Sequence, residues 1–183
     1  MFPVFFDTCV LLKPYLCDTV LSVAECGLYR PMWSADVLEE LKRNLVKRGA
    51  TEVQVRHRIR QMTEFFPDAE VVDYRQLIAV MTNDPKDRHV LAAAVRGGAE
   101  LIVTENLKDF RLEDVRSHGV EVVHQDEFLL DQLDLSPGTV LSCLTRQVSR
   151  YRREPRTVGD LLDVLGAEGH GCPRFAAACR EFG

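Results

Sequence analysis

Residues 83–106 read NDPKDRHVLAAAVRGGAELIVTEN, and this stretch decides the fold that we expect. Asp84 is a typical N-cap residue, Pro85 is favoured at the first helical position, and the glycines at 97–98 are typical of a helix end. The apolar run over 100–106 then follows as a buried strand. A capped helix that leads directly into such a strand indicates one unit of an alternating α/β fold.

Short apolar strands and amphipathic helices alternate on both sides of this unit. The patterns predict a strand that runs into a turn or short helix over 4–12, further strands over 69–74 and 120–124, and helices over 16–29, 35–48 and 51–66. Beyond about residue 134 the chain becomes a second region of helices. We therefore predict an α/β domain over residues 1–130, built on an open parallel sheet flanked by helices, and a helical C-terminal extension over 131–183.

The composition is that of an ordinary soluble globular protein. Its 183 residues suffice for one substantial core, and 46% of them are hydrophobic and 28% charged. No apolar run approaches the roughly 18 residues that a membrane span needs. The N-terminal apolar segments are too short and interrupted for a signal peptide, and no Lys or Arg precedes them. We expect a cytoplasmic protein with no membrane partner.

The six cysteines and five histidines form no recognisable metal or catalytic motif. No CxxC is present, and Cys9, Cys17 and Cys26 lie in apolar segments, where a free cysteine behaves as a small hydrophobe. A zinc site at His170 and Cys172 would lack a second ligand pair. Cysteine catalysis would need a histidine and an orienting acid that the spacing does not supply. We therefore expect reduced thiols.

Several polar side chains follow the predicted strands at the point where each strand ends. Asp7 ends the first strand, and Asn106 and Asp109 come just after the residues LIVT (101–104) of the later strand. Asp87 lies in the first turn of the helix that precedes that strand, three and four residues before apolar positions, and so projects from its buried side. Ligands of open α/β sheets collect at the carboxyl ends of the strands, so we expect these side chains to share one edge.

A glutamate of the helix over 35–48 can reach the same edge. At 100° per residue, Glu40 flanks the apolar arc of this helix, whereas its neighbour Glu39 nearly opposes the arc. We expect Glu40 to line a cleft and Glu39 to point at water.

Such a cluster of carboxylates predicts a bound cation. Two carboxylates about 4 Å apart repel by about 4 kcal/mol at an effective dielectric constant of 20. Ligands that are all oxygen suit Mg²⁺ or Mn²⁺ rather than zinc. Each acid also has a structural explanation: Asp7 can end a strand, Asp87 can complete a helix cap, Asp109 can cap the next helix, and Glu40 can be a solvated surface residue. Their agreement on one edge favours the metal site.

Four segments of the chain, in order, resemble the PIN-domain nucleases, in particular the VapC-like toxins of prokaryotic toxin–antitoxin pairs. They are FFDTCVL (5–11), WSADVLEELKRNL (33–45), DPKDRHVLAAA (84–94) and IVTENLKDF (102–110). The resemblance implies a PIN-like sheet and maps the family's acidic site onto Asp7, Glu40 and Asp87. The family's fourth position varies between two places, which here are Asn106 and Asp109. The resemblance also implies that Asp84 is an accessory residue and that Thr104 is a hydrogen-bonding partner of the site.

The resemblance also implies an activity and partners. The activity is metal-dependent endoribonuclease cleavage that leaves a 5′-phosphate and a 3′-hydroxyl, with Mg²⁺ or Mn²⁺ acidifying a bound water and neutralising charge on the scissile phosphate. The implied partners are an RNA substrate, with tRNA among the candidates, a cognate antitoxin protein and a second copy of the chain in a homodimer.

The basic residues are concentrated in 42–48, 56–60 and 146–156, although the net charge is −5. Each cluster alone is typical of a solvated helix face, and the overall charge gives no basic field that attracts nucleic acid. With the resemblance, the clusters become candidate clamps for the RNA backbone or an acidic antitoxin segment. The candidates are Arg43, Lys47, Arg146, Arg150 and Arg153.

Three other functions are compatible with parts of the pattern. A haloacid dehalogenase-type phosphatase would need D-x-D after the first strand, but the second acid is replaced by Cys9. A receiver domain would need a lysine opposite its acceptor aspartate, and no convincing pair is evident. A catalytically degenerate PIN-fold module that binds RNA or protein is the main alternative, against which the presence of Asp7, Glu40 and Asp87 argues.

Overall fold

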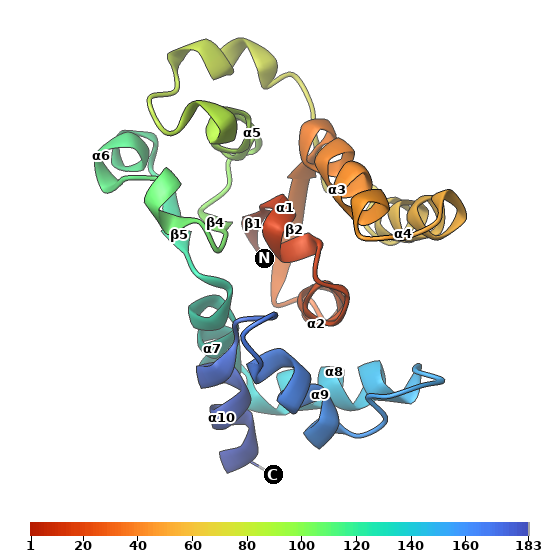
Figure 1. Cartoon of the computed structure of the whole chain (residues 1–183). Helices are drawn as coiled ribbons and strands as arrows, with labels where there is room; N and C mark the ends of the chain where they lie inside the picture. Colours follow the sequence, from red (N-terminus) through yellow and green to blue (C-terminus); the bar gives the residue numbers. More distant parts are fainter. Residues whose placement is uncertain (183) are drawn as a thin grey trace.

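The computed structural model describes residues 1–182 and is built on one parallel sheet (Figure 1). Its five strands lie in the order β3-β2-β1-β4-β5, and every neighbouring pair is parallel. The strands are β1 (Phe2–Phe6), β2 (Tyr29–Ser34), β3 (Glu70–Val71), β4 (Leu101–Val103) and β5 (Glu121–Val123). The predicted fold class, an open parallel sheet flanked by helices with a helical C-terminal region, is confirmed.

The helices that connect these strands begin and end largely where the caps in the sequence predict. The Ser34 hydroxyl accepts from the N–H of Val37 at the start of α3, Thr51 forms a capping box at the start of α4, and Gly98 adopts the left-handed conformation after α5. The helices of this part are α1 (Thr8–Leu11), α2 (Pro14–Glu25), α3 (Ala35–Lys47), α4 (Glu52–Phe65), α5 (Arg88–Gly97) and α6 (Leu112–Val115). Short 3₁₀ turns η1 (Arg75–Val80), η2 (Pro85–Asp87), η3 (Leu107–Asp109) and η4 (Arg116–His118) complete it.

The sequence prediction was wrong at two strands. It assigned no strand to β2, whose run YRPMWS contains a charged residue and a proline, both atypical of an inner strand. The sheet tolerates Pro31 because β3 pairs with β2 only at Trp33 and Ser34. The strand predicted over 69–74 is limited to β3, because Asp73 turns the chain away with a positive φ of 57°.

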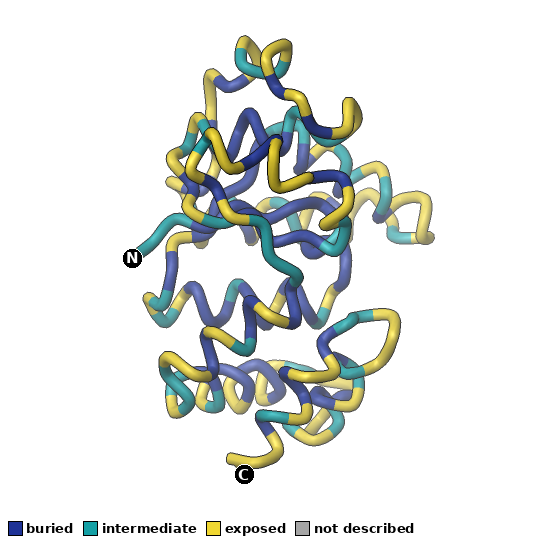
Figure 2. The backbone as a smooth tube through the Cα atoms, turned by 90° about the vertical axis from the view of Figure 1, so that its left-hand side faces the viewer, coloured by how far each residue is buried: buried dark blue, intermediate teal, exposed yellow. Residues whose placement is uncertain are grey.

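The C-terminal helices share a core with the sheet. They are α7 (Gln125–Leu135), α8 (Pro137–Ser149), α9 (Val158–Gly166) and α10 (Pro173–Glu181). The Phe128 ring of α7 lies edge-on to Tyr29 of β2, with ring centroids 4.9 Å apart, and to Phe6 of β1 at 5.6 Å. Figure 2 shows buried segments in both regions, so the extension is packed on the sheet domain and not merely tethered to it.

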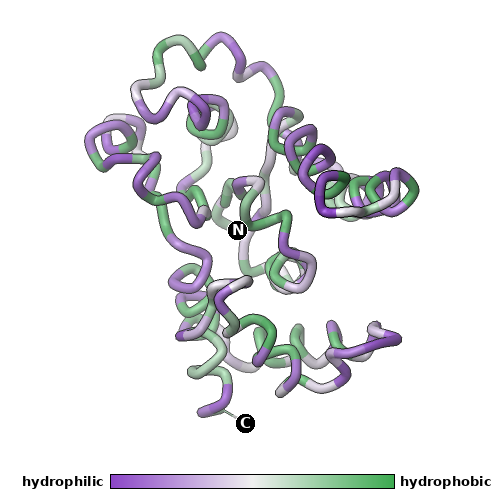
Figure 3. The backbone as a smooth tube through the Cα atoms, viewed as in Figure 1, coloured by the Kyte–Doolittle hydropathy of each residue, from purple (hydrophilic) through white to green (hydrophobic). Residues whose placement is uncertain are grey.

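The helices over 35–47 and 52–65 are amphipathic, as the spacing of their apolar residues predicted. Figure 3 shows hydrophobic and hydrophilic residues side by side along α3 and α4, and the buried residues of α3 are Val37, Leu38, Leu41 and Leu45. Across residues 1–182, every helix is too short or too polar to cross a membrane.

Candidate active site

Asp7 lies where the ends of β1 and β4 meet, and it is buried, with 4% of its surface exposed. Its N–H donates to the Val103 carbonyl at 3.1 Å. Its Oδ1 accepts from the N–H of Thr8 at 2.6 Å and thereby caps α1, while Oδ2 accepts from the Thr104 hydroxyl at 2.7 Å and the Cys9 thiol at 3.2 Å. Asp7 is thus a strand-end cap as well as a carboxylate fixed at the carboxyl edge of the sheet.

Asp87 holds a carboxylate oxygen that has no hydrogen-bond partner in the described residues. This atom, Oδ2, is buried, and the ammonium of Lys86 lies 3.8 Å from it. Burial, together with repulsion from Asp7, raises the pKa of Asp87 to about 7. A buried carboxylate oxygen without a hydrogen-bond partner is costly, and a bound cation would stabilise it.

Asp109, which lies in η3, belongs to the same group of acids. It is buried, and its Oδ2 accepts from Lys86 Nζ at 2.9 Å. This hydrogen bond raises the pKa of Lys86, and the negative charge of Asp109 adds to the raised pKa of Asp87. Asn106 is half-buried and donates its backbone N–H to Thr104 Oγ1 at 3.1 Å. Of the two predicted fourth positions, Asp109 is the one joined to Asp87 through Lys86.

Glu40 lies on the α3 side of the site and is half-buried, whereas Glu39 is exposed, which is the difference in exposure that the helical wheel predicts. Glu40 Oε2 accepts from the Thr8 hydroxyl at 2.9 Å, and Oε1 lies 3.5 Å from His89 Nε2. The proximity of His89 lowers the pKa of Glu40, and the same pairing outweighs the opposing effect of burial and raises the pKa of His89. Glu39 is exposed and pairs with Lys42 at 2.6 Å.

Several contacts at the site were not predicted from the sequence. Thr8 joins Asp7 to Glu40, Lys86 joins Asp87 to Asp109, and His89 pairs with Glu40. Lys86 and His89 lie within the DPKDRHV motif, on either side of Asp87, so their proximity to the acids was readable from the sequence, but their partners were not. Asp84 is exposed and accepts from the Lys86 N–H at 3.1 Å, as a helix cap does.

The residues present suit a hard cation, although they do not enclose one. Within residues 1–182, no three His, Cys, Asp or Glu side chains are placed so that they could hold a metal ion together. The donor set nevertheless consists of carboxylate and hydroxyl oxygens, which Mg²⁺ and Mn²⁺ prefer. The unpartnered Asp87 Oδ2 and the ammonium of Lys86 beside it mark where positive charge is required.

The predicted basic residues fall into two groups. Arg43 and Lys47 are exposed on α3, and Arg43 lies 3.9 Å from Glu40 Oε1. The other three lie on or after α8: Arg146 donates to the sulfurs of Cys26 and Cys143, Arg150 lies 3.6 Å from Glu25, and Arg153 is exposed. Of these five residues, Arg43 is the one with a described contact to a candidate acid, Glu40.

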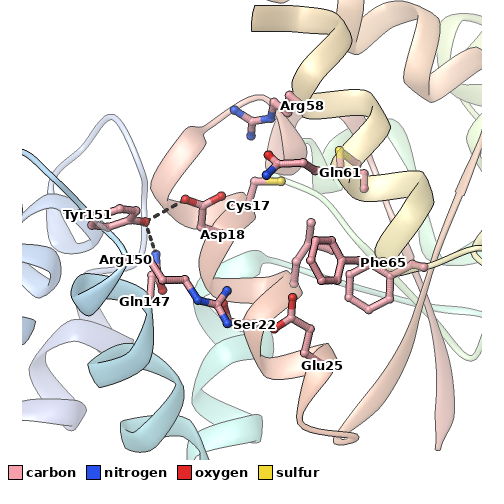
Figure 4. A pocket seen from close by; sticks show the side chains of 13 residues that line it. Cys17, Asp18, Ser22, Glu25, Arg58, Gln61, Phe65, Gln147, Arg150 and Tyr151 are labelled. Atoms are coloured by element: carbon pink, nitrogen blue, oxygen red, sulfur yellow. Dashed lines mark hydrogen bonds and ion pairs between the residues drawn. The ribbon is translucent and has the colours of Figure 1, made fainter.

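A separate cavity of about 270 Å³ lies between α2, α4 and α8 (Figure 4). Arg150 and Arg58 line it, and the Tyr151 hydroxyl donates to Asp18 at 2.8 Å across its margin. None of the predicted metal-binding residues lines this cavity. It is therefore distinct from the carboxylate cluster.

Comparisons with known proteins agree with this architecture. A family model described as PIN domain matches residues 3–108, and the chain belongs to this family. A second model, VapC50 C-terminal domain, matches residues 125–181. A protein of Mycobacterium tuberculosis (strain ATCC 25618 / H37Rv) named "Putative ribonuclease VapC50" is 47% identical over 108 residues. That match covers 59% of this chain and 62% of the relative, so it spans less than two thirds of the relative's length.

No solved structure gives a significant match. The resemblance to VapC-like PIN proteins is thus confirmed.

Proposed function

We propose that this chain is a metal-dependent endoribonuclease, the cytoplasmic toxin of a toxin–antitoxin pair. The observation that carries the proposal is Asp87, whose buried oxygen lacks a partner and whose pKa is raised to about 7 beside Asp7 and Asp109. A cluster of acids at the carboxyl edge of a parallel sheet, one of them with a strongly raised pKa, is typical of an active site. Membership of the PIN family and the ribonuclease name of the relative support the same function.

In this proposal, the catalytic acids are Asp7, Glu40, Asp87 and Asp109, which also bind Mg²⁺ or Mn²⁺. When bound, the metal supplies an acidified water and neutralises charge on the phosphodiester. Asn106 is the other candidate for the fourth ligand. Asp109 is favoured because it is buried and shares Lys86 with Asp87. Asp84 acts as a helix cap and contributes to the site only through the position of Lys86.

The remaining side chains hold these acids in place. The Thr104 hydroxyl and the Thr8 N–H each donate to one oxygen of Asp7, which fixes the plane of its carboxylate. His89 lies 3.5 Å from Glu40 and lowers the pKa of that carboxylate. Lys86 neutralises Asp109, and its exposed ammonium is free to turn toward an RNA phosphate when the cation binds.

The partners follow from the positions of the basic residues. We assign RNA phosphates to Arg43 and Lys47, which lie on the α3 face beside Glu40. Arg150 and Arg153 are assigned to an acidic segment of the antitoxin, and Arg146 to the packing of α8 on α2. An RNA such as tRNA as the substrate and a homodimer as the assembly are further parts of the proposal.

Cleavage by the purified chain tests this function. Wild type incubated with RNA in Mn²⁺ should yield discrete fragments with 5′-phosphates, and EDTA should abolish them. Asp87→Asn should not cleave, because it removes a catalytic charge. Asp84→Asn is the matched control three residues earlier in the same motif, and it should cleave normally because asparagine is an equally good cap. Fragments that persist in Asp87→Asn would contradict the assignment.

One observation favours a second function, that of a degenerate module that binds RNA without cleaving it. Lys86 lies between Asp87 and Asp109 and supplies the positive charge there. If this lysine has permanently replaced a metal, the wild-type chain should bind RNA equally well in EDTA and in Mn²⁺, with no 5′-phosphate fragments in either.

A further inference from the structure

A polar cluster joins the C-terminal extension to the loop that follows β4. It consists of the side chains of Lys13, Glu105 and Gln125 and the backbone carbonyl of His170. The loop that contains His170 connects α9 to α10 and projects from the C-terminal helices toward the sheet (Figure 1). The cluster is therefore a junction between segments that are far apart in the sequence.

Each of the four polar groups in the cluster makes hydrogen bonds with two of the others. Glu105 Oε1 accepts from Lys13 Nζ and from Gln125 Nε2, the latter at 3.0 Å. The same two donors reach the His170 carbonyl at 3.4 and 3.3 Å. The Lys13 side chain is only 10% exposed, so its charge is stabilised by these acceptors rather than by water. A shared network of this kind fixes the relative position of its members.

The cluster lies directly behind the candidate active site. Glu105 stands in the chain between Thr104 and Asn106, and its N–H donates to Cys9 Sγ at 3.3 Å. Lys13 follows α1, the helix that Asp7 caps. The ion pair between Lys13 and Glu105 thus connects the loop of Asp7 with the loop that carries Thr104 and leads to η3.

The extension approaches this ion pair through a glycine. Gly171 has a φ of +68°, and a Cβ at this position would lie 3.0 Å from Gln125 Nε2 and 3.3 Å from Glu105 Oε1. The position therefore requires glycine both for its backbone conformation and for the close approach to Glu105.

We propose that the loop over 167–172 of the C-terminal extension is a positioning element for the candidate active site. It holds Glu105 against Lys13 and so keeps Thr104 and Asp109 in register with Asp7. No residue of this loop acts on RNA. The inference rests on the proposed ribonuclease function for its effect on catalysis, but its effect on the loop after β4 is a property of the folded chain alone.

Two matched glycine variants test the proposal. Gly171→Ala and Gly119→Ala place alanine at the same φ of +68°, but a Cβ at Gly119 has no atom within 4 Å. Both variants should lose similar stability from backbone strain. In EDTA, only Gly171→Ala should increase the hydrogen-exchange rate of the backbone amides over 104–109, by about tenfold. It should also lower the kcat of RNA cleavage by about tenfold with KM unchanged, because RNA binding residues are untouched.

Glu105 variants provide a second route should Gly171→Ala fail to fold. Glu105→Gln keeps an acceptor oxygen for both Lys13 and Gln125 and should retain more of the protection over 104–109 than Glu105→Ala, which removes the acceptor altogether. Equal exchange over 104–109 in the two glycine variants, or equal protection in the two Glu105 variants, would overturn the proposal. A wild-type chain that cleaves no RNA would refute the ribonuclease function but would leave the exchange result, measured without metal, to decide this inference.

Discussion

At the scale of single residues, the decisive feature is Asp87, which is partly buried and is repelled by Asp7. Burial and this repulsion raise the pKa of Asp87 to about 7, against an ordinary value near 3.9. The folded chain therefore binds this proton more tightly than the unfolded chain. The resulting stabilisation is fully present below about pH 4 and is lost as the pH rises through about 7.

Removal of the Asp7 charge should relieve this repulsion. We expect Asp7→Asn to lower the pKa of Asp87 in metal-free protein, because one like charge is gone while asparagine can still accept from the Thr8 N–H. A carboxyl-carbon NMR titration of both proteins in EDTA measures this pKa. An unchanged Asp87 pKa would mean that the two carboxylates do not interact, and the cluster would lose its basis.

The two glutamates of α3 offer a comparison between adjacent residues. Glu40→Gln should abolish cleavage and lower the pKa of His89, whose charge Glu40 stabilises. Glu39→Gln should leave both unchanged, because Glu39 is exposed and contacts Lys42. Cleavage rates and a proton NMR titration of His89 check this, and equal losses in the two variants would refute the assignment.

At the scale of elements, the accuracy of the sequence prediction depended on the type of signal. The unit over 83–106 carries an N-cap, a proline and terminal glycines, and the structure follows its helix closely, while the strand predicted over 100–106 is limited to β4. β2 was missed because Arg30 and Pro31 interrupt the apolar pattern expected of a buried strand. The burial of this strand is decided by its neighbours in the sheet. The common location of these acids was predictable from strand ends, which share an edge, and from helix faces, while their role stays a prediction. The partners Thr8, Lys86 and His89 were not, since they depend on how separate elements pack.

The exposed face of α3 carries a prediction about RNA binding. Each phosphate contact in single-stranded RNA contributes about −0.7 to the slope of log affinity against log salt. Replacement of Arg43 and Lys47 by glutamine should flatten this slope by roughly 1.4 if each contacts one phosphate. The matched pair Arg150→Gln and Arg153→Gln should leave the RNA slope unchanged and weaken antitoxin binding. Filter binding at several salt concentrations distinguishes the two faces.

At the scale of the whole molecule, the C-terminal extension is part of the same folded body as the sheet. Phe128 packs on Tyr29 and Phe6, and the cluster at Glu105 reaches the loop behind the site. The predicted division at residue 130 stays a prediction, and the matching C-terminal family model begins at residue 125. Periodicity revealed the helices of the extension but not their contacts, because contacts over 100 residues apart leave no local pattern.

The central claim is that the acids at the edge of the sheet bind a divalent cation, and thermal unfolding in EDTA and in Mn²⁺ tests it most directly. A ligand that binds only the folded state stabilises it by about 2.7 kcal/mol at 100 times its dissociation constant. Wild type and Asp84→Asn should therefore melt at a higher temperature in Mn²⁺, and Asp87→Asn should gain much less. An equal gain in all three proteins, or none in wild type, would contradict the metal site.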